Sequence, residues 1–268
     1  MFNNIPMVVK NLLIINVLML VATEAASGVF GMDLHHLFGL HHWSSDLFMI
    51  HQFVTYMFMH GSIAHLFFNM FALWMFGRIL EQVWGPKRFL IYYLFTGIGA
   101  GVLQMIVVSF GLNGLENAIN SISISSSPDA YATFIDDYVP TQFLQPFQEI
   151  LAIWISDPTS AEFKASALDL ANQLLTLRRD IGTVGASGSV FGILLAFGML
   201  FPNTELFLLF PPIPIKAKYF VIGYGAIELY MGFANNPSDN VAHFAHLGGM
   251  LFGFILIKYW KKNTNLFY

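Results

Sequence analysis

Charge and cysteine are both scarce in this chain of 268 residues. Only 10% of its residues are Asp, Glu, Lys or Arg, against about 25% in soluble domains, and 56% are hydrophobic. So little charge excludes a nucleic-acid-binding protein and a disordered chain. The absence of cysteine excludes a disulfide scaffold, a thiolate metal site and a cysteine nucleophile. The composition instead predicts an integral membrane protein.

Long runs without charge indicate how the chain crosses the membrane. Residues 89–115, 181–204 and 240–257 contain no Asp, Glu, Lys or Arg, and a bilayer core takes about 20 apolar residues per helix. Together with the other apolar stretches, these runs predict an all-α polytopic membrane protein with six transmembrane helices. The expected spans cover about residues 7–26, 57–80, 89–110, 183–200, 217–233 and 241–260.

Positive charge predicts the orientation. With the N-terminus inside, nine of the 12 Lys and Arg residues fall in inner segments, and the other three lie in residues 112–180. A segment of that length is translocated largely regardless of charge. We therefore expect both termini to be cytoplasmic, and a bacterial inner membrane as the location. The apolar start followed by small residues at 25–28 also fits a cleavable signal peptide, which leaves five spans, so charge alone does not decide the count.

Residues 112–180 differ from the rest in composition, with nine acidic and three basic residues. Thr159 and Glu162 predict a capping box at the start of a helix. Apolar residues then recur at helical spacing, at Phe163, Ala167, Leu170, Ala171 and Leu174. We expect a mostly helical extracytoplasmic insertion, accessory to the chemistry, within a single membrane domain over residues 1–268.

Polar side chains inside membrane helices are costly, so each one is a candidate for function. His65 and Asn69 are four residues apart and therefore share a helix face. Ser187 lies in the run GASG at residues 185–188, and His246 precedes Gly249 by three residues. Both neighbour Gly-x-x-x-Gly pairs, which let helices approach closely: Gly188 with Gly192, and Gly249 with Gly253.

Close approach of those two helices predicts an imidazole within hydrogen-bond reach of a hydroxyl, as the activation of a serine nucleophile requires. His65, Asn69 and the amide of Ser187 at its helix start are candidate donors to an oxyanion. A plain packing role for the small residues, or a hydrogen bond between helices for a lone His or Asn, explains each feature singly. Their joint occurrence favours catalysis.

Residues 60–81 (HGSIAHLFFNMFALWMFGRILE), with GASG at 185–188 and AHLGG at 245–249, resemble the rhomboid family of intramembrane serine proteases. The order of the six expected spans is also similar. The resemblance implies a rhomboid-like bundle that cuts transmembrane segments of other membrane proteins near the extracytoplasmic side, with span five as a lateral gate. It implies Ser187 as nucleophile and His246 as general base, in a dyad without a carboxylate, metal or cofactor. His65 and Asn69 would stabilise the oxyanion, with supporting roles for Gly185, Gly188, Phe191 and Gly249.

The sequence departs from the family pattern at two places. Trp43 is followed by Ser44 where well-known members have an Arg, and no Lys or Arg occurs from residue 11 to 77. An anchoring role of that Arg is therefore absent or moved. Phe191 stands where a Tyr can stack on the catalytic histidine, so stacking is retained and the hydroxyl contact is not.

Other ionisable residues have weaker claims on function. The histidines at 35, 36, 41, 42 and 51 suggest a metal, but adjacent pairs point in different directions and no acidic pattern completes a site, so we expect none. Glu228 can orient His243 or His246, although a water-facing position is the commoner role for such a residue. We expect His243 to be a surface or interface histidine bonded to the outer loop, and Glu81 to tie the inner end of span two to a loop.

Two other classes of protein compete with the protease. A non-proteolytic rhomboid-like protein would bind client transmembrane helices without cutting them. A transporter would usually show broken helices or paired repeats, and no internal repeat is visible. The expected partners are the lipid bilayer and transmembrane protein substrates, with no nucleic acid, and the oligomeric state stays open.

Overall fold

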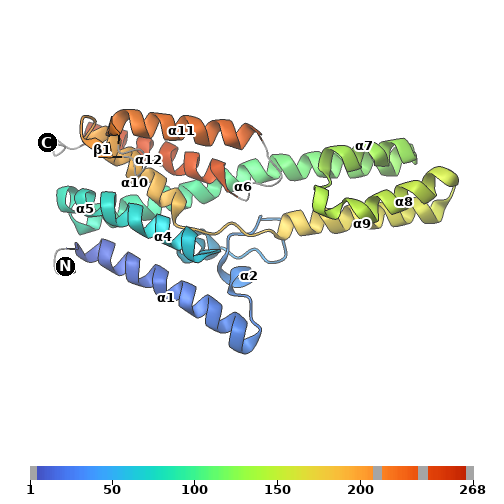
Figure 1. Cartoon of the computed structure of the whole chain (residues 1–268), viewed down its shortest axis with the longest axis horizontal. Coiled ribbons are helices and arrows are strands. Elements are labelled where there is room, and N and C mark those ends of the chain that lie inside the picture. Colours follow the sequence, from blue (N-terminus) through green and yellow to red (C-terminus); the bar gives the residue numbers. More distant parts are fainter. Residues whose placement is uncertain (1–4, 208–212, 235–240, 264–268) are drawn as a thin grey trace. The chain divides into compact units, whose positions relative to one another are not determined.

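The computed structural model describes residues 5–207, 213–234 and 241–263, and most of these residues are helical (Figure 1). The chain divides into two compact units. The first comprises Met1–Leu40, Phe48–Met105 and Gly182–Tyr268, and the second comprises His41–Leu47 and Ile106–Ile181. Helix α6, Pro86–Ser125, contributes to both.

The first unit contains the apolar helices. Its strands β1, Glu205–Phe207, and β2, Pro214–Lys216, pair antiparallel with Leu206 opposite Ile215. Within the described residues, three helical stretches are long and apolar enough to cross a bilayer, namely Met7–Phe30, Ile63–Trp84 and Pro86–Ser125, and Ser187–Leu200 is apolar but shorter. The helices are α1 (Met7–Phe30), α2 (Leu34–Phe38), α3 (Gln52–Thr55), α4 (Ile63–Ala72), α5 (Arg78–Trp84), α10 (Ser187–Leu200), α11 (Ala217–Ala234) and α12 (His243–Asn263), with a 3-10 turn at Tyr56–Phe58 and a π-helical turn at Leu73–Gly77.

Each expected span overlaps one of these helical stretches, but two of the expected starting points are wrong. The second stretch begins at Ile63 rather than residue 57, because Ser62 caps it by accepting a hydrogen bond from the His65 N–H at 3.1 Å. Helix α10 begins at Ser187 rather than residue 183, because Gly185 has φ +128° and interrupts the helical backbone. The count of six spans stays a prediction.

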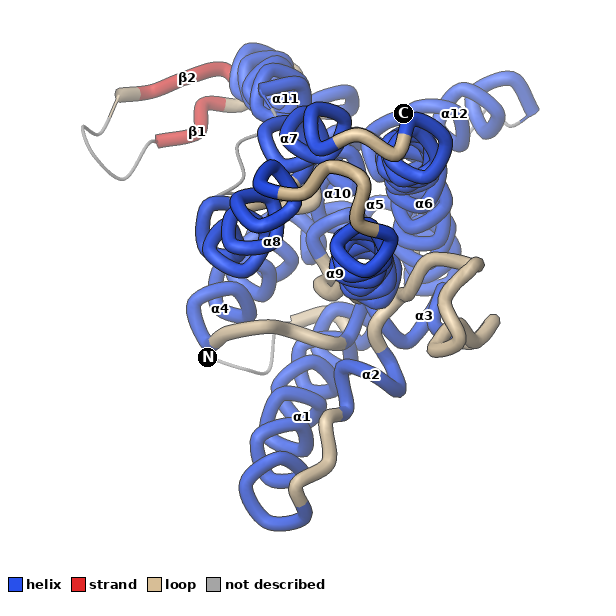
Figure 2. Tube along the Cα trace, turned by 90° about the vertical axis from the view of Figure 1, so that its right-hand side faces the viewer, coloured by secondary structure: helices blue, strands red, loops and turns tan. Residues whose placement is uncertain are grey.

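The second unit packs the later part of α6 with α7 (Pro128–Tyr138), α8 (Leu144–Ser156) and α9 (Ala161–Asp180), and includes a 3-10 turn at Thr141–Phe143. Figures 1 and 2 both show α8 and α9 side by side. The third span is expected to end at about residue 110, and the helix that contains it, α6, continues beyond that point to Ser125. Its extension buries apolar residues at helical spacing, which are Leu112, Leu115, Ile119 and Ile122.

Helix α9 follows the expected apolar spacing. Ala167, Ala171 and Leu174 are buried in the core of the second unit. The expected capping residue is wrong by one position, because Ser160 caps α9 by accepting from the Phe163 N–H at 3.3 Å. Thr159 is engaged instead with the Asp157 carboxylate, to which its hydroxyl donates at 2.9 Å.

Glu81 fastens α5 to the start of α1. The Val8 N–H donates to its Oε1 at 2.9 Å and the Val9 N–H donates to its Oε2 at 2.8 Å. Helix α1 has Pro6 at its N-cap, which offers no side-chain acceptor, so the Glu81 carboxylate satisfies amides that would otherwise lack partners. The expected structural role of Glu81 is confirmed, although its partner is the start of a helix rather than a loop.

We expect Glu81→Gln to destabilise the protein by about 2 kcal/mol, because one acceptor oxygen becomes an NH2 group that faces a buried amide donor. Unfolding of the purified protein in detergent measures this loss. Glu24→Gln is the matched control, since Glu24 is exposed on α1. Equal stability of the Glu81 variant and the control would show that the carboxylate does not hold α1.

Candidate functional site

The chain before α10 is held in place so that Ser187 is the first residue of the helix. Leu40 and Thr183 exchange two backbone hydrogen bonds of 2.9 Å, and the Gly185 N–H donates to the carbonyl of Tyr56 at 2.9 Å. At φ +128° only glycine is unstrained, so Gly185 lets the chain turn into the helix. Ser187 is half-buried, and its amide belongs to the first turn, whose N–H groups lack partners within the helix.

Helices α10 and α12 touch through glycines. A Cβ added at Gly249 would collide with the carbonyl oxygen of Gly188. The second glycine of each pair packs elsewhere, since a Cβ at Gly192 would lie 2.7 Å from Thr96 of α6 and a Cβ at Gly253 would collide with the Tyr92 hydroxyl of α6. Of these two glycine pairs, it is therefore Gly188 and Gly249 that bring α10 and α12 together, next to Ser187 and one turn from His246.

The ring of His246 contacts two side chains, Phe191 and Glu228. Its ring stacks on Phe191 with centroids 4.1 Å apart and an angle of 6° between the planes, and its Nδ1 lies 2.8 Å from Glu228 Oε2. Phe191 follows Ser187 by one helical turn, so the stack brings His246 to the face of α10 that carries the serine. The stacking implied for Phe191 is thus present in the structure.

The Nδ1 contact leaves Nε2 as the nitrogen able to take a proton. Among the described residues no hydrogen bond joins Ser187 to His246. Hydrogen bonds between catalytic groups often tighten only when substrate binds, so the arrangement is compatible with general-base chemistry.

His65 and Asn69 lie on α4. A Cβ at Gly185 would be 2.8 Å from the His65 ring and 3.6 Å from Ser187 Oγ, so these two side chains border the same spot. Asn69 is buried, and its Nδ2 has no hydrogen-bond partner within the described part of the chain. It is one of several such buried atoms in the described residues, and its place one turn after His65 leaves it available to donate to a group that enters the site.

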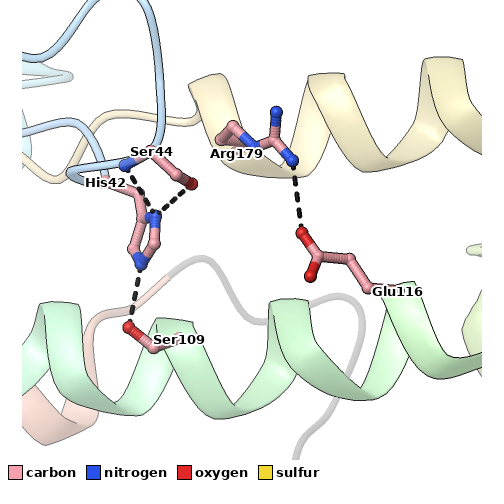
Figure 3. A network of polar contacts seen from close by, with 5 residues as sticks. All are labelled: His42, Ser44, Ser109, Glu116 and Arg179. Carbon is pink, nitrogen blue, oxygen red and sulfur yellow. Dashed lines mark hydrogen bonds and ion pairs between the residues drawn. The ribbon is translucent and has the colours of Figure 1, made fainter.

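One histidine of the first loop, His42, makes structural contacts. His42 Nδ1 lies 2.7 Å from Ser44 Oγ and its Nε2 lies 2.8 Å from Ser109 Oγ (Figure 3). Burial, and then the nearby Arg179 guanidinium, lower the pKa of His42, so the neutral ring that can serve both hydroxyls is favoured. Arg179 itself pairs with Glu116 at 3.3 Å. His42 therefore ties the loop to α6 within the second unit.

Two side chains differ from what the sequence favoured. The sequence favours a water-facing position for Glu228, and this is wrong, because Glu228 is only 5% exposed. His243, expected as a surface or interface histidine bonded to the outer loop, is not at the surface, since it is buried and has its Nδ1 2.6 Å from Glu228 Oε2. Glu228 shares the buried face of α11 with Ala217 and Val221. Their spacing was the signal in the sequence that could have placed Glu228 inside.

Comparisons with known proteins agree on a family. The family model described as the Rhomboid domain matches residues 47–156 and 149–262. An uncharacterised mitochondrial rhomboid protein of Schizosaccharomyces pombe is 27% identical over 85% of this chain and 57% of its own length. The chloroplastic rhomboid-like protein 11 of Arabidopsis thaliana is 37% identical over 28% of each chain. The rhomboid protease GluP of Bacillus subtilis is 38% identical over 23% of this chain and 12% of its own. The chain thus spans less than two thirds of the length of each of these relatives.

We expect Gly249→Ala to lower the melting temperature in detergent, because the new methyl group meets the backbone of Gly188, which no rotamer change can relieve. Overpacking of this kind typically costs about 1 to 3 kcal/mol. Gly223→Ala is the matched control, since a Cβ at this position of α11 meets nothing within 4 Å. A Gly249 variant as stable as the Gly223 variant would contradict the close contact.

Proposed function

The chain belongs to the rhomboid family, and we propose that it is an intramembrane serine endopeptidase that cuts transmembrane segments of membrane-protein substrates near the extracytoplasmic side. One observation carries this proposal. The contact of Gly188 with Gly249 and the stack of His246 on Phe191 bring an imidazole to the helix face that carries Ser187. The name of GluP as a rhomboid protease supports the same activity.

In the proposed reaction, Ser187 Oγ attacks the carbonyl carbon of the scissile peptide bond while His246 Nε2 takes the hydroxyl proton. His246 then gives that proton to the nitrogen of the leaving segment as the C–N bond breaks. The acyl group remains on Ser187. A water molecule next attacks this ester, His246 takes the proton of the water, and its return to Oγ releases the second product.

The oxyanion of each tetrahedral intermediate needs donors. We assign this role to the His65 ring, the Asn69 amide and the backbone N–H of Ser187. The half-buried His65 borders the same spot as Ser187 Oγ, and the Nδ2 of Asn69 lacks a partner among the described residues. Donors that are fixed before reaction stabilise developing charge without reorganising.

We further propose six spans with cytoplasmic termini, in contact with lipid and with transmembrane substrates. The apolar helices and the family support an integral membrane protein. The names of the relatives point to mitochondria and chloroplasts as well as to a bacterium, so a bacterial inner membrane has no support from them over an organelle membrane. The termini and the membrane of residence therefore stay predictions.

We propose that residues 112–180 act as an extracytoplasmic accessory element rather than as part of the catalytic site. The second unit has a core of its own, which includes Tyr131, Phe134, Phe147 and Trp154. The proposed catalytic residues all lie in the first unit. A segment with an independent core can influence substrate choice without supplying a catalytic group.

Ser187→Ala and His246→Ala should each abolish cleavage of a tagged single-span substrate co-expressed with the protein, because one removes the nucleophile and the other the base. Immunoblotting for the shortened substrate measures this, at equal levels of the variants. Ser121→Ala, which changes an exposed serine of α6, is the matched control. Cleavage by Ser187→Ala at the wild-type rate would falsify the assignment. Substrate binding with no cleavage by the wild type would favour the non-proteolytic alternative.

Asn69→Ala should lower kcat about 10²- to 10³-fold with little change in KM, as is typical when an oxyanion donor is lost. Purified protein and a fluorogenic transmembrane peptide in detergent supply both constants. Asn172→Ala, which replaces an exposed asparagine of α9, controls for the substitution itself. A rise in KM with unchanged kcat would instead assign Asn69 to substrate binding.

A further inference from the structure

We propose that Glu228 is a positioning residue that holds the His246 ring for proton transfer, so that the site works as a Ser187–His246–Glu228 triad rather than a dyad. The inference rests on the proposed peptidase function and concerns the same site. It departs from the dyad that the family resemblance implies.

The contacts of Glu228 carry the inference. Its Oε2 lies 2.8 Å from Nδ1 of His246 and 2.6 Å from Nδ1 of His243. An ionised carboxylate only accepts hydrogen bonds, so both imidazoles donate from Nδ1. A proton on Nδ1 of neutral His246 leaves the lone pair on Nε2, which is the tautomer that a general base requires.

The orientation of His246 is then fixed at several points. Phe191 stacks on one face of the ring, and the hydrogen bond to Glu228 prevents rotation of the ring within its plane. His243 meets His246 edge-on, with centroids 6.3 Å apart and planes at 86°. When His246 takes the proton of Ser187, the carboxylate lies next to the new positive charge and stabilises it.

Burial makes the carboxylate effective. Glu228 is 5% exposed and His246 is 8% exposed, so the interaction is weakly screened by solvent. Other positions of α11 that carry large side chains are mostly exposed, including Tyr219, Ile222, Ile227 and Tyr230. A charged residue on the narrow buried face of this helix is costly unless its partners are fixed, and the two histidines are those partners.

The same three side chains could hold a metal ion, since their ligand atoms lie within 4.8 Å of one another. The individual distances favour direct hydrogen bonds. Zinc bonds of about 2.0 to 2.2 Å at tetrahedral angles separate neighbouring ligand atoms by roughly 3.3 Å. The two Nδ1–Oε2 distances of 2.6 and 2.8 Å are shorter than this and match charge-assisted hydrogen bonds.

The test compares Glu228→Gln, Glu228→Asp and His243→Gln with Glu24→Gln, an exposed position on α1. We expect Glu228→Gln to lower kcat by about 10² to 10⁴ with KM nearly unchanged, because the wrong tautomer of the base then competes. Glu228→Asp keeps the charge and should recover part of kcat. His243→Gln keeps the bond from Glu228 to His246, so its loss of kcat should be at least tenfold smaller than that of Glu228→Gln.

Three results would overturn the inference. If Glu228→Gln lowers only the melting temperature and leaves kcat intact, Glu228 merely tethers α11 to α12. If His243→Gln and Glu228→Gln lose kcat equally, the carboxylate does not act through His246. One zinc per purified wild-type chain, lost in Glu228→Gln, would make the cluster a metal site. If the wild type itself cleaves no substrate, the proposed peptidase function is wrong. The three results above concern Glu228 in a protein that does cleave or that binds zinc, so failure of the two proposals can be told apart.

Discussion

The arrangement of the site depends on one backbone contact, between Gly188 of α10 and Gly249 of α12. Lipid-facing helices gain little from burying apolar surface, so close packing and hydrogen bonds hold them together. Here the contact is so close that a Cβ at Gly249 has no room. Because His246 lies one turn before Gly249, the same contact determines how near its ring comes to the serine face of α10.

Two buried hydroxyl groups near this contact have defined partners and connect α6 to α10. The Tyr92 hydroxyl donates to the carbonyl of Gly192, and the Ser189 hydroxyl donates to the carbonyl of Tyr93, both at 2.8 Å. In apolar surroundings such bonds are strong because water offers no alternative. Asn69 differs, since its buried Nδ2 lacks a partner in the described part of the chain. Other buried polar atoms of the described residues also lack partners, among them both ring nitrogens of His60 and the Tyr93 hydroxyl. The position of Asn69 one turn after His65 on α4 is therefore what links it to the proposed site.

Much of this fold could be predicted from the sequence, because apolar periodicity and small-residue spacing are local signals. The six expected spans overlap helices, and the apolar face of α9 lies where its spacing put it. Boundaries failed where a single side chain or backbone angle decided them, as with Ser62 before α4 and Ser160 before α9.

Partners that come from distant parts of the chain could be predicted only in part: the glycine pairs predicted that α10 and α12 meet, but not every contact of those glycines. No local pattern reveals that Gly192 packs against Thr96 of α6. The sequence offers Glu228 as a group that can orient His243 or His246, but no local pattern reveals that it accepts hydrogen bonds from both. The spacing of Glu228 with Ala217 and Val221 favours the buried face of α11, but only the three-dimensional arrangement of α11 and α12 shows which side chains Glu228 meets there.

The central claim is that packing of α10 against α12 turns Ser187 into a nucleophile. The most direct measurement is the rate at which a fluorophosphonate probe forms a covalent adduct with the folded protein, with the modified residue identified by peptide mass spectrometry. We predict a single adduct on Ser187, formed much more slowly in His246→Ala. An unmodified Ser187 in folded wild-type protein, or labelling at the same rate without His246, would contradict it.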